Sequence, residues 1–189
     1  MSVNLARVNV LLVDDNRSMR ALVKQILHAF GVKNIHECSS GLEAMEELKL
    51  FPADVVIADW VMEPLDGLHL VREIRTSPDS PNSYVPIIML TGHTELRRVE
   101  EARDAGVTEF LAKPITAQAV YQRLIQIIDR PRPFLKTEKF TGPDRRRTEQ
   151  DLPQGMRSRR KADAKNENAS DGDGDNRLSQ EDVDKIIDD

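Results

Sequence analysis

Three carboxylates, a threonine and a lysine occupy positions where short apolar runs end. Asp14 and Asp15 follow "VNVLLV", Asp59 closes "DVVIAD", Thr91 closes "VPIIMLT", and Lys113 follows "TEFLA". Carboxylates that converge repel one another unless a cation lies among them, and oxygen-only ligands suit Mg2+. A carboxylate can also attack phosphorus and form an acyl phosphate, whose charged oxygens need positive and hydrogen-bonding partners. These residue types therefore predict phosphoryl chemistry supported by Mg2+.

The elements that must position these side chains can be read from the periodicity of the apolar residues. Continuous apolar runs are typical of strands covered on both faces, and steps of three and four residues are typical of helices. Five strands that alternate with five helices predict an α/β, doubly wound parallel sheet, whose ligand site lies beyond the carboxyl ends of the central strands. The expected strands are 8–13, 34–38, 54–59, 85–91 and 108–112, and the expected helices are roughly 19–30, 41–50, 67–76, 94–105 and 116–129.

Four motifs together carry a family resemblance. They are "LLVDDN", "VVIADWVMEPLDG", "IIMLTG" and "EFLAKPI". Over residues 7–130 the chain resembles the receiver domain of two-component response regulators, the CheY-like family. The resemblance implies a five-stranded flavodoxin-like sheet in the order 2-1-3-4-5. It also implies a signalling domain that supports its own phosphorylation and dephosphorylation and is not a dedicated enzyme.

The resemblance assigns a role to each polar residue at the strand ends. Asp59 is expected to be the phosphorylated residue, with a histidine kinase or a phosphotransfer protein as the donor. Asp14, Asp15 and Asp59 are expected to hold Mg2+, together with the backbone carbonyl of Val61.

The fourth and fifth strands are expected to carry the switch. By the same resemblance, Thr91 and Lys113 contact the phosphoryl group, and the peptide bond between Lys113 and Pro114 is cis. Movement of Thr91 is expected to couple to the side chain of Phe110, although Phe110 is equally compatible with a plain core residue. A dehalogenase-like phosphatase is the enzyme alternative, but it expects an Asp-x-Asp motif after the first strand, and "VDDN" does not supply one.

Composition limits the cellular compartment and the kinds of site that are expected. Cys38 is the only cysteine, which excludes an intramolecular disulfide and a cysteine-based zinc site. No apolar run approaches the length that spans a bilayer, and the first residues lack the pattern of a secretory signal. We therefore expect a cytoplasmic protein without a membrane partner.

The last third of the chain has a different composition. Residues 131–165 carry 11 Lys and Arg against 5 Asp and Glu, whereas residues 166–189 carry 2 against 9. We expect a basic, disordered linker followed by an acidic tail, because these residues are poor in the branched apolar side chains that form a core. The segment leaves no room for a DNA-binding output domain, so specific DNA binding is not expected.

The arginine cluster Arg145, Arg146 and Arg147 permits three interpretations. It can be a solvated part of the linker, or it can attract nucleic acid without sequence preference. It also resembles the arginine-rich tails of CheY-like cyclic-di-GMP effectors, since guanidinium groups pair with phosphate and stack on guanine.

The final residues, "DGDGDNRLSQEDVDKIIDD", also leave alternatives open. One is a calcium loop with Asp171, Asp173, Asp175 and Asp182 as ligands, although Asn176 stands where the sharp turn of such a loop needs Gly. Another is a merely solvated acidic tail.

The third alternative is a short amphipathic docking helix over residues 179–187, begun by a capping pair of Ser179 and Asp182. It resembles the amino-terminal peptide of the flagellar switch proteins FliM and FliY, which binds phosphorylated CheY on the face formed by the fourth helix, the fifth strand and the fifth helix, and the resemblance implies docking on that face. A tether of about 48 residues reaches roughly 35 to 40 Å, so the helix could dock on its own domain or on another receiver. The apolar residues of this face are Leu178, Val183, Ile186 and Ile187.

Together these features predict a response regulator that acts through protein contacts in chemotaxis or motility. The alternative is a cyclic-di-GMP-binding adaptor of the flagellar motor in which phosphorylation is secondary.

Overall fold

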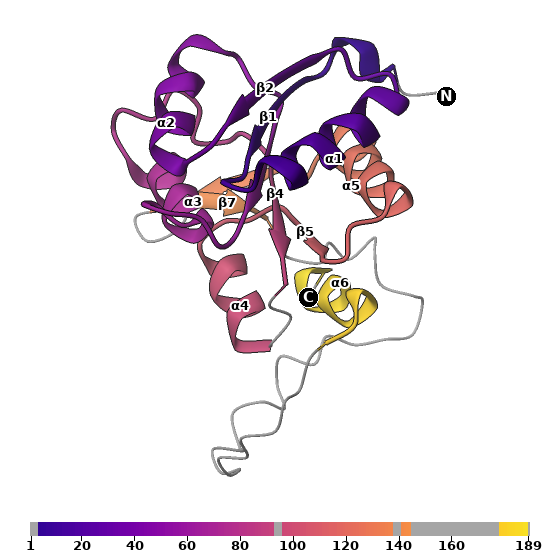
Figure 1. The fold of residues 1–189 in the computed structure, drawn as a ribbon. Coiled ribbons are helices and arrows are strands. Elements are labelled where there is room, and N and C mark those ends of the chain that lie inside the picture. Colours follow the sequence, from indigo (N-terminus) through magenta and orange to yellow (C-terminus); the bar gives the residue numbers. More distant parts are fainter. Residues whose placement is uncertain (1–3, 93–95, 138–140, 145–177, 189) are drawn as a thin grey trace.

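Figure 1 shows the computed structural model of the chain, which describes residues 4–92, 96–137, 141–144 and 178–188. A five-stranded parallel sheet has the order β2-β1-β3-β4-β5, as the family resemblance predicted. Its strands are β1 (Asn9–Val13), β2 (Asn34–Cys38), β3 (Val55–Asp59), β4 (Ile87–Thr91) and β5 (Glu109–Ala112). Every residue of β3 and β4 is buried, as expected for central strands covered on both faces.

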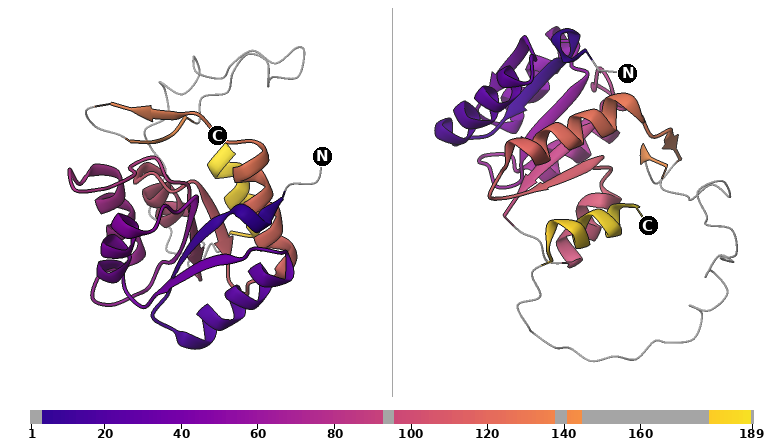
Figure 2. Two further views of the ribbon diagram at one scale, coloured as in Figure 1. Left: turned by 90° about the horizontal axis from the view of Figure 1, so that it is seen from above. Right: turned by 90° about the vertical axis from the view of Figure 1, so that its right-hand side faces the viewer.

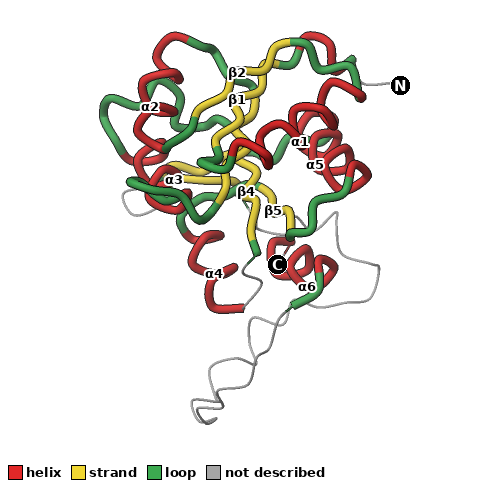
Figure 3. The backbone as a smooth tube through the Cα atoms, viewed as in Figure 1, coloured by secondary structure: helices red, strands yellow, loops and turns green. Residues whose placement is uncertain are grey.

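Helices cover both faces of this sheet (Figure 3). A short 3-10 helix, η1 (Leu5–Arg7), precedes β1, and α1 (Arg17–Ala29) and α5 (Ala117–Asp129) pack on one face. The other face is covered by α2 (Gly41–Leu50), α3 (Gly67–Thr76) and α4 (Leu96–Asp104). None of the helices in the described part of the chain is long and apolar enough to cross a membrane.

Side-chain caps fix where most of these helices begin. Asn16, Ser40, Asp66 and Thr116 stand directly before α1, α2, α3 and α5, and each accepts a hydrogen bond from a backbone N–H of the first turn. Such caps satisfy donors that have no partner within the helix. The loops that follow β1, β3 and β5 therefore end at defined points, close to the predicted boundaries.

A small antiparallel hairpin lies where the linker was predicted to be disordered. Strands β6 (Phe134–Lys136) and β7 (Thr141–Pro143) pair within the predicted linker, residues 131–165. The prediction is wrong for this part of the linker. Local composition did not reveal the hairpin, because its stabilising contacts are made with residues far away in the sequence.

Phe134 and Arg75 hold the hairpin on the domain. The Phe134 ring lies edge-on to Tyr84 with 5.8 Å between centroids, and the Arg75 guanidinium lies 5.2 Å from the Phe134 centroid. Arg75 is buried and donates two hydrogen bonds to the carbonyl of Gly106, at 3.1 and 2.9 Å. Burial lowers the pKa of Arg75 to about 9.

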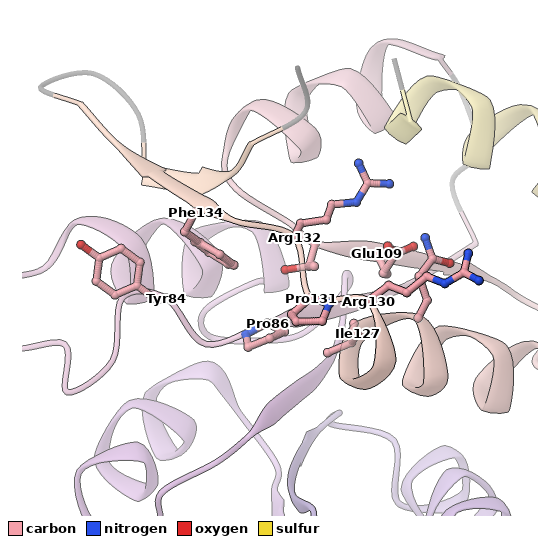
Figure 4. Close-up of a pocket in the computed structure, with 10 residues that line it drawn as sticks. Tyr84, Pro86, Glu109, Ile127, Arg130, Pro131, Arg132 and Phe134 are labelled. Atoms are coloured by element: carbon pink, nitrogen blue, oxygen red, sulfur yellow. The ribbon is translucent and has the colours of Figure 1, made fainter. Parts of the chain in front are cut away.

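A mostly apolar pocket separates the hairpin from the end of α5 (Figure 4). Its labelled lining residues are Tyr84, Pro86, Glu109, Ile127, Arg130, Pro131, Arg132 and Phe134. Pro86 precedes β4 and Glu109 begins β5, so the pocket lies at the amino-terminal edge of these strands. The polar residues that predict phosphoryl chemistry lie at the opposite, carboxyl edge.

The last helix, α6 (Gln180–Asp188), agrees with the predicted helix at 179–187 to within one residue at each end. Ser179 precedes it, and its hydroxyl accepts a hydrogen bond from the N–H of Asp182 at 3.2 Å. The Asp182 carboxylate in turn accepts from the Ser179 N–H at 3.2 Å. This reciprocal cap is the one that the sequence predicted. Figure 2 shows α6 lying beside α4 and β5.

Candidate functional site

The predicted carboxylates come together at the carboxyl edge of the sheet. Asp14 and Asp15 follow β1, Asp59 ends β3, and one carboxylate oxygen from each lies within 4.8 Å of the others. Asp14 and Asp59 are buried, whereas Asp15 is exposed. Because β1 and β3 are neighbours with parallel register, their ends place these three side chains at one point. The cluster is therefore open to solvent on the Asp15 side.

The environment of Asp14 fits a cation. Its Oδ1 accepts a hydrogen bond from the Asn16 N–H at 2.7 Å, but its buried Oδ2 has no hydrogen-bond partner among the described residues. Burial, with a smaller contribution from Asp59, raises the pKa of Asp14. A divalent cation would pair with the unsatisfied oxygen and offset the repulsion, so the three carboxylates fit Mg2+.

The Asp59 carboxylate contacts a backbone N–H and the ammonium group of Lys113. Its Oδ1 accepts a hydrogen bond from the Trp60 N–H at 2.8 Å and lies 2.8 Å from the Nζ of Lys113. Gly67 approaches the backbone of Asp59 so closely that a β-carbon there would lie 2.1 Å from the Asp59 carbonyl oxygen. A side chain at position 67 would therefore displace the end of β3 or the start of α3.

Lys113 and Thr91 are joined through the backbone at the ends of β4 and β5. The Lys113 N–H donates to the Thr91 carbonyl at 2.7 Å, and Thr91 is buried. The peptide bond between Lys113 and Pro114 is cis, as predicted. The sequence did not predict the second cis bond, between Glu63 and Pro64 in the loop after β3.

Phe110 and Val61, two further residues of the predicted site, differ in burial: Phe110 is buried and Val61 is exposed. The Phe110 side chain is fully buried in the core between the sheet and α4, which is compatible with either a switch or a core role. Val61 is exposed in the loop after β3, two residues beyond Asp59. The metal role of its carbonyl remains a prediction.

Arg20 is a residue of the site that sequence reasoning missed. It lies in the first turn of α1, and its Nη1 donates to the Asp14 carbonyl at 2.5 Å. Its Nε lies 3.7 Å from the Glu37 carboxylate of β2. The sequence feature that could have revealed Arg20 is a basic residue five positions after the aspartate pair, Asp14 and Asp15. Arg20 ties the loop that carries Asp14 to the start of α1.

Comparison with known proteins agrees with this geometry. The sequence model of the response regulator receiver domain matches residues 10–125. The chain belongs to the response regulator receiver family. As a receiver domain it is of a type that generally signals and does not act as a dedicated enzyme.

Two chemotaxis proteins are similar in sequence to this receiver. Chemotaxis protein CheY-3 of Vibrio cholerae is 34% identical over 123 residues, which cover 65% of this chain and 93% of its own length. Chemotaxis protein CheY of Pseudomonas aeruginosa is 31% identical over 123 residues, covering 65% of this chain and 98% of its own length. The similarity therefore spans nearly all of each relative and leaves the last third of this chain unmatched.

Solved structures give the same result. CheY4 of Vibrio cholerae superposes with a TM-score of 0.59 at 28% identity and covers 64% of this chain and 98% of its own. The receiver domain of the histidine kinase CKI1 of Arabidopsis thaliana, solved with Mg2+, has a TM-score of 0.57 at 30% identity, with 65% of this chain and 94% of its own covered. A CheX–CheY complex of Borrelia burgdorferi with Mg2+ and a beryllofluoride has a TM-score of 0.58 at 27% identity, covering 64% and 88%.

Several predictions on the tail lie outside the described residues. They concern the arginine cluster, Arg145 to Arg147, and three of the four proposed calcium ligands, Asp171, Asp173 and Asp175. The side chain of Ile187 is also outside them. The fourth proposed calcium ligand, Asp182, instead takes part in the cap at the start of α6.

Proposed function

We propose that this receiver is phosphorylated on Asp59 with Mg2+ and signals by protein contacts, in chemotaxis or motility. The observation that carries the proposal is the meeting of three carboxylates within 4.8 Å, with Lys113 at 2.8 Å from Asp59. The names of the relatives support the chemotactic setting. The donor is a histidine kinase or a phosphotransfer protein, as the family resemblance implies.

The arrangement supports a direct transfer. A carboxylate oxygen of Asp59 attacks phosphorus, a P–O bond forms, and the bond from phosphorus to the donor's histidine nitrogen breaks. Lys113 moves from its ion pair with Asp59 to the oxygens of the arriving phosphoryl group, and the Thr91 hydroxyl lies at the end of the neighbouring strand. Asp14, Asp15 and Asp59 would hold Mg2+, and the bound ion would supply the positive charge that lets an anion approach this acidic site.

Phosphoryl uptake from acetyl phosphate, a small acyl-phosphate donor, tests the proposal. The wild type should incorporate labelled phosphoryl only when Mg2+ is present, and Asp59→Asn should abolish the signal because the nucleophile is lost. Asp79→Asn is the matched control, because Asp79 is an exposed aspartate outside the site. Stable labelling of Asp59→Asn, or of the wild type in excess chelator, would contradict the assignment.

Metal binding can be followed independently of phosphorylation. Trp60 is the only tryptophan, is buried, and directly follows Asp59, so its fluorescence reports on the site. Asp15→Asn should weaken Mg2+ binding by about tenfold or more, since one ligand charge is lost. An unchanged affinity would remove Asp15 from the metal site.

A further inference from the structure

Helix α6 covers the face of the receiver formed by α4, β5 and α5. Val183 is fully buried against the same core as Val99 and Ala102 of α4 and Phe110 of β5. Ile186 packs against this core from the next turn of α6. Figures 1 and 2 show the helix lying along β5 with α4 beside it. An element near the end of the chain is thus part of the domain core.

Gln180 completes the open edge of the sheet. Strand β5 is an edge strand, so its outward N–H and C=O groups have no neighbouring strand to bond with. The Gln180 side chain accepts from the Ala112 N–H at 2.6 Å and donates to the Phe110 carbonyl at 3.2 Å. One carboxamide therefore satisfies both a donor and an acceptor of the strand, as a neighbouring peptide unit would.

Arg123 of α5 provides the charged contact of this face. Its guanidinium donates to the Asp184 carboxylate of α6 and to the Phe110 carbonyl, the latter at 3.1 Å, and lies 3.7 Å from Glu109. Asp184 also accepts a hydrogen bond from the Gln180 side chain at 2.8 Å. Helix α6 therefore meets the receiver through defined hydrogen bonds and an ion pair as well as through apolar packing.

We propose that α6 is an intramolecular ligand of this face, and that a partner must displace it with a helix of the same chemistry. That helix would carry a glutamine for the β5 edge, an acidic residue for Arg123, and an apolar side chain between them. The proposal deepens the proposed function by naming the partner class. It rests on the proposed function in taking protein contacts as the way in which this receiver signals.

Competition follows from the groups that α6 occupies. The N–H of Ala112 can donate to only one docked helix at a time, and the space filled by Val183 admits one apolar side chain. Because α6 belongs to the same chain, an external helix competes against an effective concentration on the order of mM. A free partner with modest affinity is therefore excluded until α6 leaves.

A labelled peptide of residues 178–189, titrated into the full-length chain, tests the proposal without any phosphoryl donor. In wild type the face is filled, so the peptide should bind weakly. In Val183→Glu, α6 should leave its site, because the buried position cannot accept a charge. The apparent affinity for the peptide should then increase by a factor of about 100 or more.

Glu181→Ala is the matched control, because Glu181 is an exposed acidic residue of the same helix. It should behave as wild type. Equal affinities of wild type and Val183→Glu would overturn the proposal. A dimer that forms with increasing concentration and disappears in Val183→Glu would overturn the intramolecular arrangement in favour of exchange between two chains.

Hydrogen exchange at the Ala112 amide gives a second measurement that does not depend on the charged variant. Gln180→Ala should increase its exchange rate by about tenfold or more, because the bond from Ala112 to Gln180 is lost. The Leu111 amide of the same strand is the internal reference. An unchanged rate at Ala112 would show that Gln180 does not hold the edge of β5 and would overturn the proposal.

Because neither assay uses phosphorylation, failure of phosphoryl transfer at Asp59 leaves both results interpretable.

Discussion

Asp14 lowers the stability of the metal-free domain, although its carboxylate is suited to binding a cation. Its side chain is fully buried, its Oδ2 has no hydrogen-bond partner among the described residues, and burial raises its pKa. The ionised form that a metal needs is therefore the form that folding disfavours. A site of this kind gains affinity for Mg2+ because the cation relieves a cost already present in the metal-free domain.

Asp14→Asn should raise the free energy of unfolding at neutral pH when Mg2+ is removed by a chelator. Asp14 has a higher pKa in the folded domain, so its contribution to stability is fully present below the unfolded value of 3.8 and is lost as the pH rises through the folded value. Asparagine keeps the neutral state at every pH. The gap between variant and wild type should therefore widen as the pH rises above 3.8.

Urea unfolding between pH 4 and 8, followed by Trp60 fluorescence, measures this gap. Added Mg2+ should stabilise the wild type and leave Asp14→Asn nearly unchanged, because the variant lacks a metal ligand. Parallel pH profiles of the two proteins would contradict the prediction. Asp79→Asn, at an exposed position, should follow the wild type throughout.

The hairpin depends on a close backbone approach that only glycine allows. Gly106 has φ +99°, and a β-carbon there would lie 2.6 Å from the Thr141 carbonyl oxygen of β7 and 3.0 Å from Nε of Arg75. Gly106→Ala should therefore cost about 2 to 4 kcal/mol, from the left-handed backbone and from the clash together. Denaturant unfolding of the full chain measures the loss.

Gly31 separates these two causes. It has φ +89° but no atom within 4 Å of a β-carbon, so Gly31→Ala should cost only about 1 to 2 kcal/mol from the backbone. Loss of the hairpin in Gly106→Ala should also raise the exchange rates of amides in residues 134–136. Equal costs for the two variants would contradict the packing of β7 on Gly106.

Most of the receiver could be predicted because its signals are local. Apolar runs indicate the strands, and polar residues at the ends of those runs indicate the candidate site. The start of α6 was also predictable, since the cap of Ser179 and Asp182 needs only residues three apart. Asp14, Asp59 and Lys113 meet as expected because parallel strands end at one edge.

The hairpin and the individual contacts of α6 could not be predicted, and the physical reason is the same for both; docking of this helix on the face of the fourth helix, fifth strand and fifth helix was an expectation from the family resemblance alone. Phe134 is stabilised by Tyr84 and Arg75, and Gln180 by the backbone of β5 about 70 residues earlier. Such contacts leave no periodic pattern in the nearby sequence. A basic, proline-containing segment was therefore interpreted as disordered where a distant surface in fact orders it.

Strand β5 connects the candidate phosphorylation site with the surface on which α6 lies. Gln180 holds the N–H of Ala112, and the next residue, Lys113, pairs with Asp59. If Asp59 carries a phosphoryl group, as proposed, Lys113 has to leave its ion pair with Asp59, and we expect the movement to reach the neighbouring residue Ala112. The proposed phosphorylation and the docking of α6 should then be coupled, and the coupling should be the same in both directions.

The coupling can be measured with the Val183→Glu chain, whose α4–β5–α5 face is free for the peptide of residues 178–189. Beryllofluoride with Mg2+, a mimic of the phosphoryl group, should tighten peptide binding by about fivefold or more. The expected direction follows from the predicted switch. Phe110 is buried while α6 is docked, and a movement of Thr91 toward the phosphoryl group is expected to favour this buried position of Phe110. Saturating peptide should tighten beryllofluoride binding, read from Trp60, by the same factor. A factor of one in both titrations would show that α6 and the phosphorylation site act independently.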